Sequence, residues 1–343
     1  MRRKLLDAND IKISFRTQES QATAVSGISF HINEGETVGI VGESGCGKSI
    51  TSLSIMRLLP ASPYCEVEGS IHFEENNILD LPESEMRNIR GNRISMIFQD
   101  PLTSLNPVFT IGKQINEALL LHRKVSRAQA NALTMEMLRK VGISRPESIV
   151  KEYPYQLSGG MRQRIMIAMA LICKPKLLIA DEPTTALDVT IQSQILDLIR
   201  ELKEETGTSI LLITHDLGVV AEMCERILVM YAGQVVEETD VVSLFVDPKH
   251  PYTVGLLQSV PQMDKKVSRL KSIPGQVPPL SQMPKGCRFA PRCSEAMEKC
   301  ITHNPELVTI KVGHACRCWL YEKGGEINEP RDHIGSPKPE EVL

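Results

Sequence analysis

Apolar and polar residues alternate near the start of the chain. Residues 11–15 and 25–32 follow the period of two that is typical of half-buried strands. Residues 33–36 (NEGE) separate the second segment from the next apolar run and predict a hairpin turn. We therefore expect an antiparallel β-layer first. Residues 37–41 (TVGIV) then predict a buried strand, and residues 48–59 have helical spacing after a glycine-rich loop.

The periodicity becomes helical in the middle of the chain. Residues 111–121 and 128–141 carry apolar side chains at helical intervals, which predicts a helical subdomain inserted at about residues 101–170. Strand patterns then return and alternate with a helical segment at 190–203; they lie at residues 177–180, 210–214 and 227–231. Strands that alternate with helices predict an α/β fold with a mostly parallel sheet.

A change of composition near residue 261 predicts a boundary. The segments IPGQVPPL and KGCRFAPRC are rich in proline, glycine and cysteine, which is typical of a linker and a small module with little core of its own. We expect one domain at residues 1–260, a C-terminal extension at 261–343, and a disordered tail at 326–343.

Charge and hydropathy limit the classes of function. The chain has 39 basic and 42 acidic residues and a net charge of -3, so no global field favours nucleic acid or an anionic membrane. The basic start turns polar before a signal-peptide core could form. No run approaches the roughly 18 apolar residues of a spanning helix. We expect a cytoplasmic protein whose membrane contact comes through a partner.

The loop at residues 42–49 (GESGCGKS) matches G-x-x-x-x-G-K-S/T between a predicted strand and helix. Its glycines let backbone NH groups and the helix N-terminus converge on phosphates. Lys48 is expected to reach the β- and γ-phosphates of ATP, and Ser49 to ligate Mg²⁺. The other expected nucleotide contacts are Gly42, Glu43, Ser44, Gly45, Cys46 and Gly47. The alternative is a tight turn without a ligand; we assign Cys46 no redox role and treat it as a small neutral filler.

Two carboxylates follow the apolar strand at residues 177–180. This position is the carboxyl edge of the sheet, where doubly wound folds bind ligands. Asp181 is the expected Mg²⁺ partner, and Glu182 is expected to orient and polarise the attacking water. Adjacent carboxylates at a strand end are otherwise often solvated or helix-capping residues.

A further segment, residues 157–163 (LSGGMRQ), resembles the signature motif of ABC ATPases. The other motifs of that family follow in order: Gln99 in IFQDP, Asp188 after DEPTTAL, and His215 in ITHD. The chain thus resembles an ABC transporter ATPase. The resemblance implies a P-loop NTPase (RecA-like) core with an antiparallel β-subdomain and a helical subdomain.

The resemblance also implies a head-to-tail dimer in which ATP lies between the 42–49 loop of one subunit and the signature turn of the other. Ser158, Gly159 and Gly160 open a predicted helix and would form a second anion site, and Gln163 is assigned to the same site. By the same resemblance, Gln99 would sense Mg²⁺ and the attacking water, His215 would contact the γ-phosphate, and Asp188 would bridge the subunits.

Phe15 lies near the family's position for an aromatic residue that stacks on adenine. A phenylalanine that only packs in the β-layer explains the sequence nearly as well.

Several segments resemble the ATP-binding subunits of oligopeptide and dipeptide importers, including FQDPLTSLNPVFTIG, HPYTVGLL and GCRFAPRC. The likeness implies a heterodimer with a second ATPase subunit, two membrane permeases, an external binding protein and no nucleic acid. Importers of nickel, glutathione and other small solutes share much of the pattern and stay open as alternatives.

Five cysteines lie close together near the C-terminus. Four of them, Cys287, Cys293, Cys300 and Cys316, have the spacing C-x5-C-x6-C-x15-C, and Cys318 is extra. Because C-x2-C pairs are absent, a 4Fe-4S cluster is favoured over zinc and over free cysteines. The resemblance supports the cluster, which some dipeptide importer ATPases carry in this extension.

Two other classes share part of this pattern. A soluble ABC ATPase acting on nucleic acid usually has a coiled-coil insertion or two tandem cassettes, and the sequence shows neither. A regulatory protein with a vestigial nucleotide site is opposed by Lys48, Asp181 and Glu182. The expected function is ATP hydrolysis that drives peptide import at the cytoplasmic face of the membrane.

Overall fold

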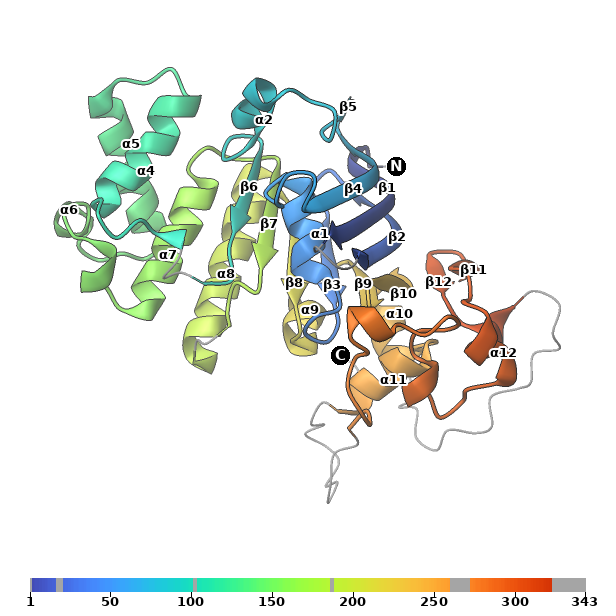
Figure 1. Ribbon diagram of the computed structural model, residues 1–343. Coiled ribbons are helices and arrows are strands. Elements are labelled where there is room, and N and C mark those ends of the chain that lie inside the picture. The colour runs from blue at the N-terminus through green and yellow to red at the C-terminus, as the bar shows by residue number, and fades with distance from the viewer. Residues whose placement is uncertain (1, 17–20, 101–103, 186–187, 260–271, 323–343) are drawn as a thin grey trace.

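The computed structural model describes residues 2–16, 21–100, 104–185, 188–259 and 272–322. A sheet of eight strands in the order β11-β12-β10-β9-β3-β8-β7-β6 crosses its centre (Figure 1). Five neighbouring strands of this sheet are parallel: β3 (Thr37–Val41), β6 (Ile94–Ile97), β7 (Leu177–Asp181), β8 (Ser209–Thr214) and β9 (Arg226–Tyr231). The predicted mostly parallel sheet is confirmed.

Both faces of the parallel strands are buried. Along β8, Ile210 and Leu212 belong to one hydrophobic cluster, whereas Leu211 and Ile213 belong to another. Successive side chains of a strand point to opposite faces, so the two clusters lie on opposite sides of the sheet. This is why the parallel strands are continuous apolar runs with no alternation.

The second sheet is antiparallel and has the order β2-β1-β4-β5. Its strands are β1 (Lys4–Arg16), β2 (Gln21–Asn33), β4 (Cys65–Phe73) and β5 (Asn76–Asn77). This confirms the expected antiparallel layer. The hairpin predicted at residues 33–36 is wrong, because β2 pairs with β1 and the turn leads to β3 in the other sheet.

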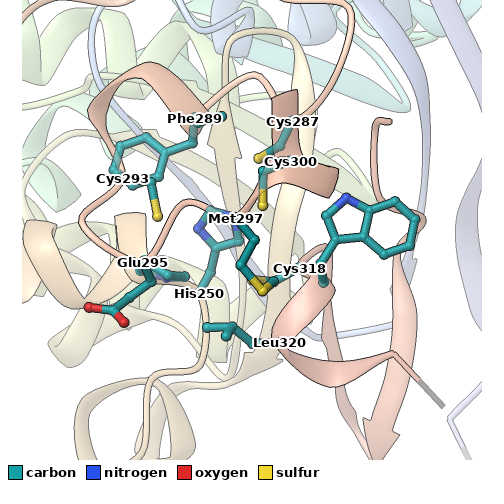
Figure 2. Close-up of a pocket in the computed structure, with 12 residues that line it drawn as sticks. His250, Cys287, Phe289, Cys293, Glu295, Met297, Cys300, Cys318 and Leu320 are labelled. Atoms are coloured by element: carbon teal, nitrogen blue, oxygen red, sulfur yellow. The ribbon is translucent and has the colours of Figure 1, made fainter. Parts of the chain in front are cut away.

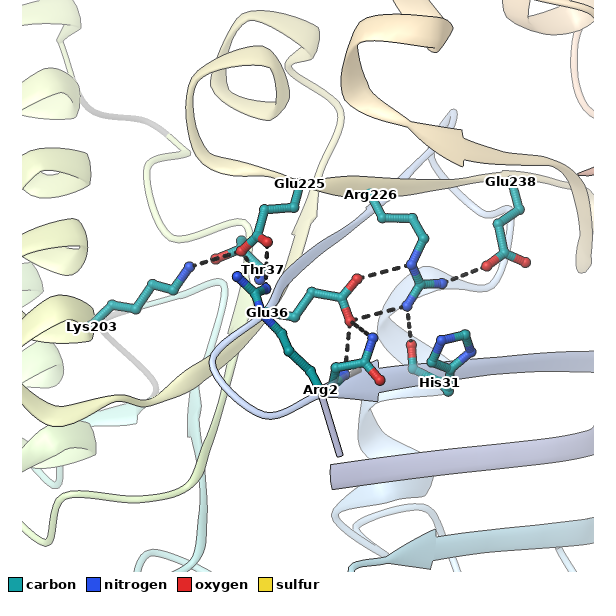
Figure 3. A network of polar contacts seen from close by, with 9 residues as sticks. Arg2, His31, Glu36, Thr37, Lys203, Glu225, Arg226 and Glu238 are labelled. Carbon is teal, nitrogen blue, oxygen red and sulfur yellow. Dashed lines mark hydrogen bonds and ion pairs between the residues drawn. The ribbon is translucent and has the colours of Figure 1, made fainter. Parts of the chain in front are cut away.

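A buried ion-pair network explains that turn (Figure 3). Glu36 accepts hydrogen bonds from the backbone NH and side chain of Asn33, both 2.8 Å long. The same carboxylate pairs with Arg226 on β9 at 2.9 Å, and Arg226 also bonds the carbonyl of His31 on β2 at 2.6 Å and the carboxylate of Glu238 at 2.5 Å. The turn is therefore a joint between sheets, which hydrophobic alternation does not reveal.

Helices surround the larger sheet. Helices α4 (Ile111–His122), α5 (Arg127–Lys140) and α7 (Gly159–Leu171) confirm the predicted helical segments in the middle of the chain. They gather at one end of the molecule in Figure 1, together with two short helices that the pattern did not predict, α6 (Pro146–Ile149) and η1 (Pro154–Gln156). The other helices before residue 260 are α1 (Lys48–Ile55), α2 (Glu83–Ile89), α8 (Val189–Thr206), α9 (Leu217–Met223), α10 (Val241–Val246) and α11 (Pro251–Gln258). Among the described residues, no helix has the length and apolar character needed to cross a membrane.

The C-terminal segment lies at the opposite end of Figure 1 and extends the larger sheet. It contains β11 (Val308–Lys311), β12 (His314–Cys316), α12 (Glu298–Thr302) and three short turns, η2 (Leu280–Gln282), η3 (Ala290–Arg292) and η4 (Trp319–Tyr321). Strand β12 pairs antiparallel with β10 (Gln234–Asp240). The tail predicted to be disordered, residues 326–343, lies outside the described residues.

A buried acid holds this extension to the core. Glu237 on β10 accepts hydrogen bonds from the backbone NH groups of Lys249 and His250 at 2.7 and 2.8 Å. Its carboxylate also lies 2.7 Å from Nε2 of His314 on β12, and both side chains are fully buried. One carboxylate thus joins β10, the segment before α11, and β12.

Candidate functional site: a phosphate loop and an acidic strand edge

The loop at residues 42–49 connects β3 to α1, as the sequence predicts. Gly45 and Gly47 have φ angles of 79° and 102°, a region that residues with a Cβ rarely adopt. A Cβ on Gly42 would lie 2.2 Å from the carbonyl oxygen of Met230. The loop is therefore fixed by its own glycines and by close packing against β9.

Lys48 and Ser49 begin α1 and point into this loop. The buried Lys48 ammonium donates to the carbonyl oxygens of Gly42 and Glu43 at 2.7 and 3.1 Å. Ser49 Oγ donates to Asp181 Oδ1 at 3.1 Å, which brings together two of the three residues predicted to contact Mg²⁺; the third, Gln99, bonds Glu182. Burial raises the pKa of Asp181, while the Ser49 hydrogen bond opposes that rise. A hydroxyl and a buried carboxylate are suitable oxygen ligands for Mg²⁺, so these residues fit the ion.

Glu182 is the centre of a second polar group. Its carboxylate accepts hydrogen bonds from Gln99 Nε2 at 2.8 Å and Thr185 Oγ1 at 2.9 Å, and it lies 3.3 Å from His215 Nδ1. Burial alone would raise the pKa of Glu182, but the hydrogen bonds from Thr185, His215 and Gln99 outweigh it and lower the pKa. The carboxylate is therefore held ionised, as a group that polarises water requires.

The backbone at Glu182 is strained. Its φ is 48°, in the left-handed region, and its NH donates to the carbonyl of Ile213 on β8 at 2.8 Å. A non-glycine residue in this region costs on the order of 1–3 kcal/mol and persists only where the surroundings enforce it. The strain turns the side chain of Glu182 towards Gln99 and His215.

The predicted signature residues lie elsewhere, on α7. Ser158 is the N-cap of this helix and accepts a hydrogen bond from the NH of Met161 at 3.3 Å, and a Cβ on Gly159 would meet no atom within 4 Å. Gln163 is buried and donates to the carbonyl of Pro183, beside Glu182. Helix α7 packs on α4, α5, α8 and β6. Ser158 and Gly159 are exposed, whereas Gly160 is half-buried and a Cβ on it would lie 3.5 Å from Ile191 on α8, so the first residues of this helix start are open to a ligand from outside the chain.

Asp188 and Phe15 belong to other elements of the fold than the loop. Asp188 caps α8 by accepting from the NH of Ile191 at 2.9 Å. Phe15 is half-buried on β1, pairs with Ala22 and Cys65 in the sheet register, and packs against the smaller sheet's hydrophobic cluster. The adenine and interface roles of these residues stay predictions.

Two residues that the sequence did not single out hold the loop from outside. Arg292 pairs with Glu43 through both terminal guanidinium nitrogens, Nη1 at 2.7 Å and Nη2 at 3.0 Å. Tyr252 Oη accepts the hydrogen bond of the Glu43 NH at 2.9 Å. The sequence segments HPYTVGLL and GCRFAPRC contain these residues, but no spacing rule connects them to a loop more than 200 positions earlier.

The cysteine-rich region forms a small cavity beside α11 (Figure 2). Four thiols line it: Cys287, Cys293, Cys300 and Cys318. Three of the four predicted ligands thus line the cavity, whereas Cys316 is fully buried in β12 and Cys318 lines the cavity in its place. Strand β12 ends at Cys316, so the chain has left the sheet two residues later and Cys318 can face the cavity.

The side chains that line this cavity can be compared with the donors that the predicted metal group requires. Within the described ranges, no three or more His, Cys, Asp or Glu side chains form a group that could hold a metal ion. Burial raises the pKa of Cys293 to about 11 and of Cys318 to about 12, and neighbouring thiols add to both shifts. Zinc with bonds of about 2.3 Å needs a tight tetrahedron of thiolates, which is not formed here. The thiol donors match the chemistry of an iron–sulfur cluster, but the geometry alone does not show one.

Comparisons with known proteins agree with this site. Residues 25–185 match the family model of the ABC transporter, and residues 236–300 match that of the oligopeptide/dipeptide transporter, C-terminal region. The dimeric ATP-binding cassette MJ0796, solved in a post-hydrolysis state with ADP and Pi, is similar with a TM-score of 0.62 and 29% identity, over 69% of this chain and 98% of its own. The fold and the site therefore define an ABC-type ATPase with a P-loop NTPase core, and the predicted fold class is confirmed.

Curated relatives narrow the class. The oligopeptide transport ATP-binding protein AppD of Bacillus subtilis is 55% identical over 94% of this chain and 98% of its own length. The dipeptide transport ATP-binding protein DppD of Bacillus subtilis is 50% identical over 94% of this chain and 96% of its own length. The chain belongs to the family of oligopeptide and dipeptide transport ATP-binding proteins of ABC transporters.

Proposed function

We propose that this chain binds and hydrolyses ATP to power the import of dipeptides or oligopeptides through membrane subunits. The observation that carries the proposal is that the phosphate loop and the oligopeptide/dipeptide C-terminal region are joined by one sheet. The phosphate loop follows β3, and the match to the oligopeptide/dipeptide C-terminal region begins at residue 236, on β10 of the same sheet, and ends at residue 300. Relatives named for oligopeptide and dipeptide transport match nearly the whole chain.

The proposed phosphate site is the 42–49 loop. Lys48 exchanges its two carbonyl partners for the β- and γ-phosphates of ATP, while loop NH groups and the start of α1 bind the remaining oxygens. Ser49 and Asp181 hold Mg²⁺, which neutralises phosphate charge when bound.

Glu182 is the proposed general base for hydrolysis. Its carboxylate accepts a hydrogen bond from the attacking water, orients that water towards the γ-phosphorus and takes its proton as the bond to the leaving oxygen breaks. Gln99 and His215 fix the carboxylate and lie on the side where water and γ-phosphate meet.

The open start of α7 favours a site shared between two subunits. Ser158 and Gly159 are exposed at the N-terminus of α7, so the partner's ATP is the proposed ligand of Ser158, Gly159 and Gly160, and Asp188 is proposed to lie at the interface. We propose a heterodimer with a homologous ATPase, two permeases contacting the helical subdomain, and an external binding protein. In that assembly the chain lies on the cytoplasmic face of the membrane.

We also propose that the cysteine cavity holds a 4Fe-4S cluster ligated by Cys287, Cys293, Cys300 and Cys318. Support comes from four thiols of distant sequence positions lining one cavity. Ligation would require thiolates, and burial opposes their formation at Cys293 and Cys318, whose pKa values it raises.

Peptide uptake tests the proposed function. Cells lacking the gene are complemented with the wild-type chain or with Lys48→Ala, and the uptake of labelled dipeptides, oligopeptides, nickel and glutathione is compared. We expect peptide uptake to return only with the wild type. Restoration of nickel or glutathione uptake without peptide uptake would assign a different cargo, and restoration by Lys48→Ala would contradict the ATPase role.

A further inference from the structure

Glu43 is the only acidic residue in the 42–49 loop. It stands directly after Gly42, in a loop whose proposed ligand carries several negative charges. Two like charges within about 8 Å repel strongly in a medium of intermediate dielectric constant. An ionised, unpaired carboxylate at this position would therefore oppose ATP binding.

The structure pairs this carboxylate with a residue from the far end of the chain. Arg292 Nη1 and Nη2 lie 2.7 and 3.0 Å from the two carboxylate oxygens of Glu43, which is the bidentate geometry of a strong pair. The Arg292 side chain is only 5% exposed, and that of Glu43 is 28% exposed. Solvent and salt therefore screen this pair much less than a surface pair.

Arg292 is itself held in place by further contacts. Its Nε donates to the carbonyl of Pro274 at 2.8 Å, its Nη1 donates to Tyr231 Oη at 3.3 Å, and its guanidinium carbon lies 5.7 Å from the centre of the Tyr231 ring. Tyr252, fully buried, accepts the NH of Glu43. The charge and the backbone of the second loop residue are thus both fixed by residues that follow the ATPase motifs.

We propose that Arg292 is a positioning residue for nucleotide binding, which neutralises Glu43 and fixes the start of the phosphate loop. The C-terminal region then sets the affinity for ATP without touching the nucleotide. The inference rests on the proposed assignment of residues 42–49 as the phosphate site. If Arg292 only joined the two parts of the fold, its removal would lower stability, and the effect of that removal would not depend on the charge at position 43.

The test measures KM and kcat for ATP in the assembled transporter with its partner subunits. Arg292→Gln is expected to raise KM about tenfold and to leave kcat nearly unchanged, because an unpaired Glu43 repels the bound phosphates before any chemistry. The KM increase should shrink as ionic strength rises. Arg292→Lys keeps the charge and loses the bidentate geometry, so it should restore KM in part.

The double variant Arg292→Gln/Glu43→Gln decides between neutralisation and simple anchoring. Removing the carboxylate as well is expected to return KM close to the wild-type value, even where thermal stability stays reduced. An unchanged KM in Arg292→Gln, or a double variant as weak as Arg292→Gln, would overturn the proposal.

Arg317→Gln is the matched control. Arg317 also lies next to a cavity cysteine and also holds the C-terminal region to the core, through the carbonyl of Val235 at 2.9 Å, but it pairs with no loop residue. It should lower stability and leave KM unchanged; a KM rise equal to that of Arg292→Gln would assign the effect to the region as a whole. Lys48→Ala tests the phosphate site independently of the role of Arg292. If Lys48→Ala still binds ATP, the assignment of residues 42–49 as the phosphate site is refuted.

Discussion

The phosphate loop and the cysteine cavity differ in how the chain builds them. The loop is one continuous segment, and its glycines and the start of α1 set its shape locally. The cavity receives its thiols from three separate places, the turn around η3, helix α12, and the chain after β12. A local motif determines its own geometry, whereas an assembled site depends on every contact that brings its segments together.

The first prediction tests the local site, and its effect should be the largest. Glu182→Gln keeps the shape of the side chain and its place beside Gln99 but removes the base. Loss of a positioned general base typically lowers the rate by about 10²–10⁴-fold. We expect ATPase turnover of the assembled transporter to fall by that factor while ATP still binds. Unchanged turnover would refute the role of Glu182.

The second prediction concerns the contact that holds the assembled region to the core. Glu237→Ala removes the acceptor of two backbone NH groups and of His314 Nε2; the bonds from His250 and His314 are buried and that from Lys249 is partly buried. Leaving buried donors without a partner costs on the order of 3 kcal/mol. Urea unfolding should show a lower midpoint. Gln114→Ala removes hydrogen bonds within the helical subdomain and is the matched control. It should leave the reaction of the cavity thiols with a thiol reagent as in the wild type, whereas Glu237→Ala should make these thiols more accessible.

These two regions also show what could be predicted from sequence. The strand–loop–helix order around Lys48 and the carboxylates after β7 could be placed because each function depends on neighbours in sequence. The turn at residues 33–36 was misassigned because Glu36 is committed to Arg226, a partner 190 positions away. The different positions of Cys316 and Cys318 could not be predicted for a similar reason, since only the pairing of β12 with β10 decides which thiol leaves the sheet.

The third prediction tests which of Cys316 and Cys318 belongs to the proposed cluster site. Protein purified without oxygen should lose its iron and sulfide in Cys318→Ala and keep both in Cys316→Ala, because Cys318 lines the cavity and Cys316 does not. Cys316→Ala deletes one buried sulfur and should cost about 1 kcal/mol in stability. Iron retained in Cys318→Ala and lost in Cys316→Ala would reverse the assignment. Colourless wild-type protein with stoichiometric zinc would exclude the cluster.

The smallest expected effect is on the pH dependence of hydrolysis. Hydrogen bonds from Thr185, His215 and Gln99 lower the pKa of Glu182 against the opposing effect of burial. Removing one donor by His215→Ala should raise that pKa, so the carboxylate begins to protonate at a higher pH as the solution is acidified. The acidic limb of the kcat profile, which reports groups of the enzyme–substrate complex, should move to higher pH. Since the His215 side chain is 61% exposed, solvent weakens its influence and the shift should be modest.

Thr185→Val provides the comparison for this last prediction. It removes another of the three donors, at 2.9 Å from the carboxylate, without changing any charge. If hydrogen bonding determines the pKa of Glu182, both variants should move the acidic limb in the same direction. If only His215→Ala lowers kcat, and does so equally at every pH, the histidine acts on the γ-phosphate and not through the carboxylate. A shift of the limb to lower pH in either variant would contradict the assignment of Glu182 as an ionised base held by these donors.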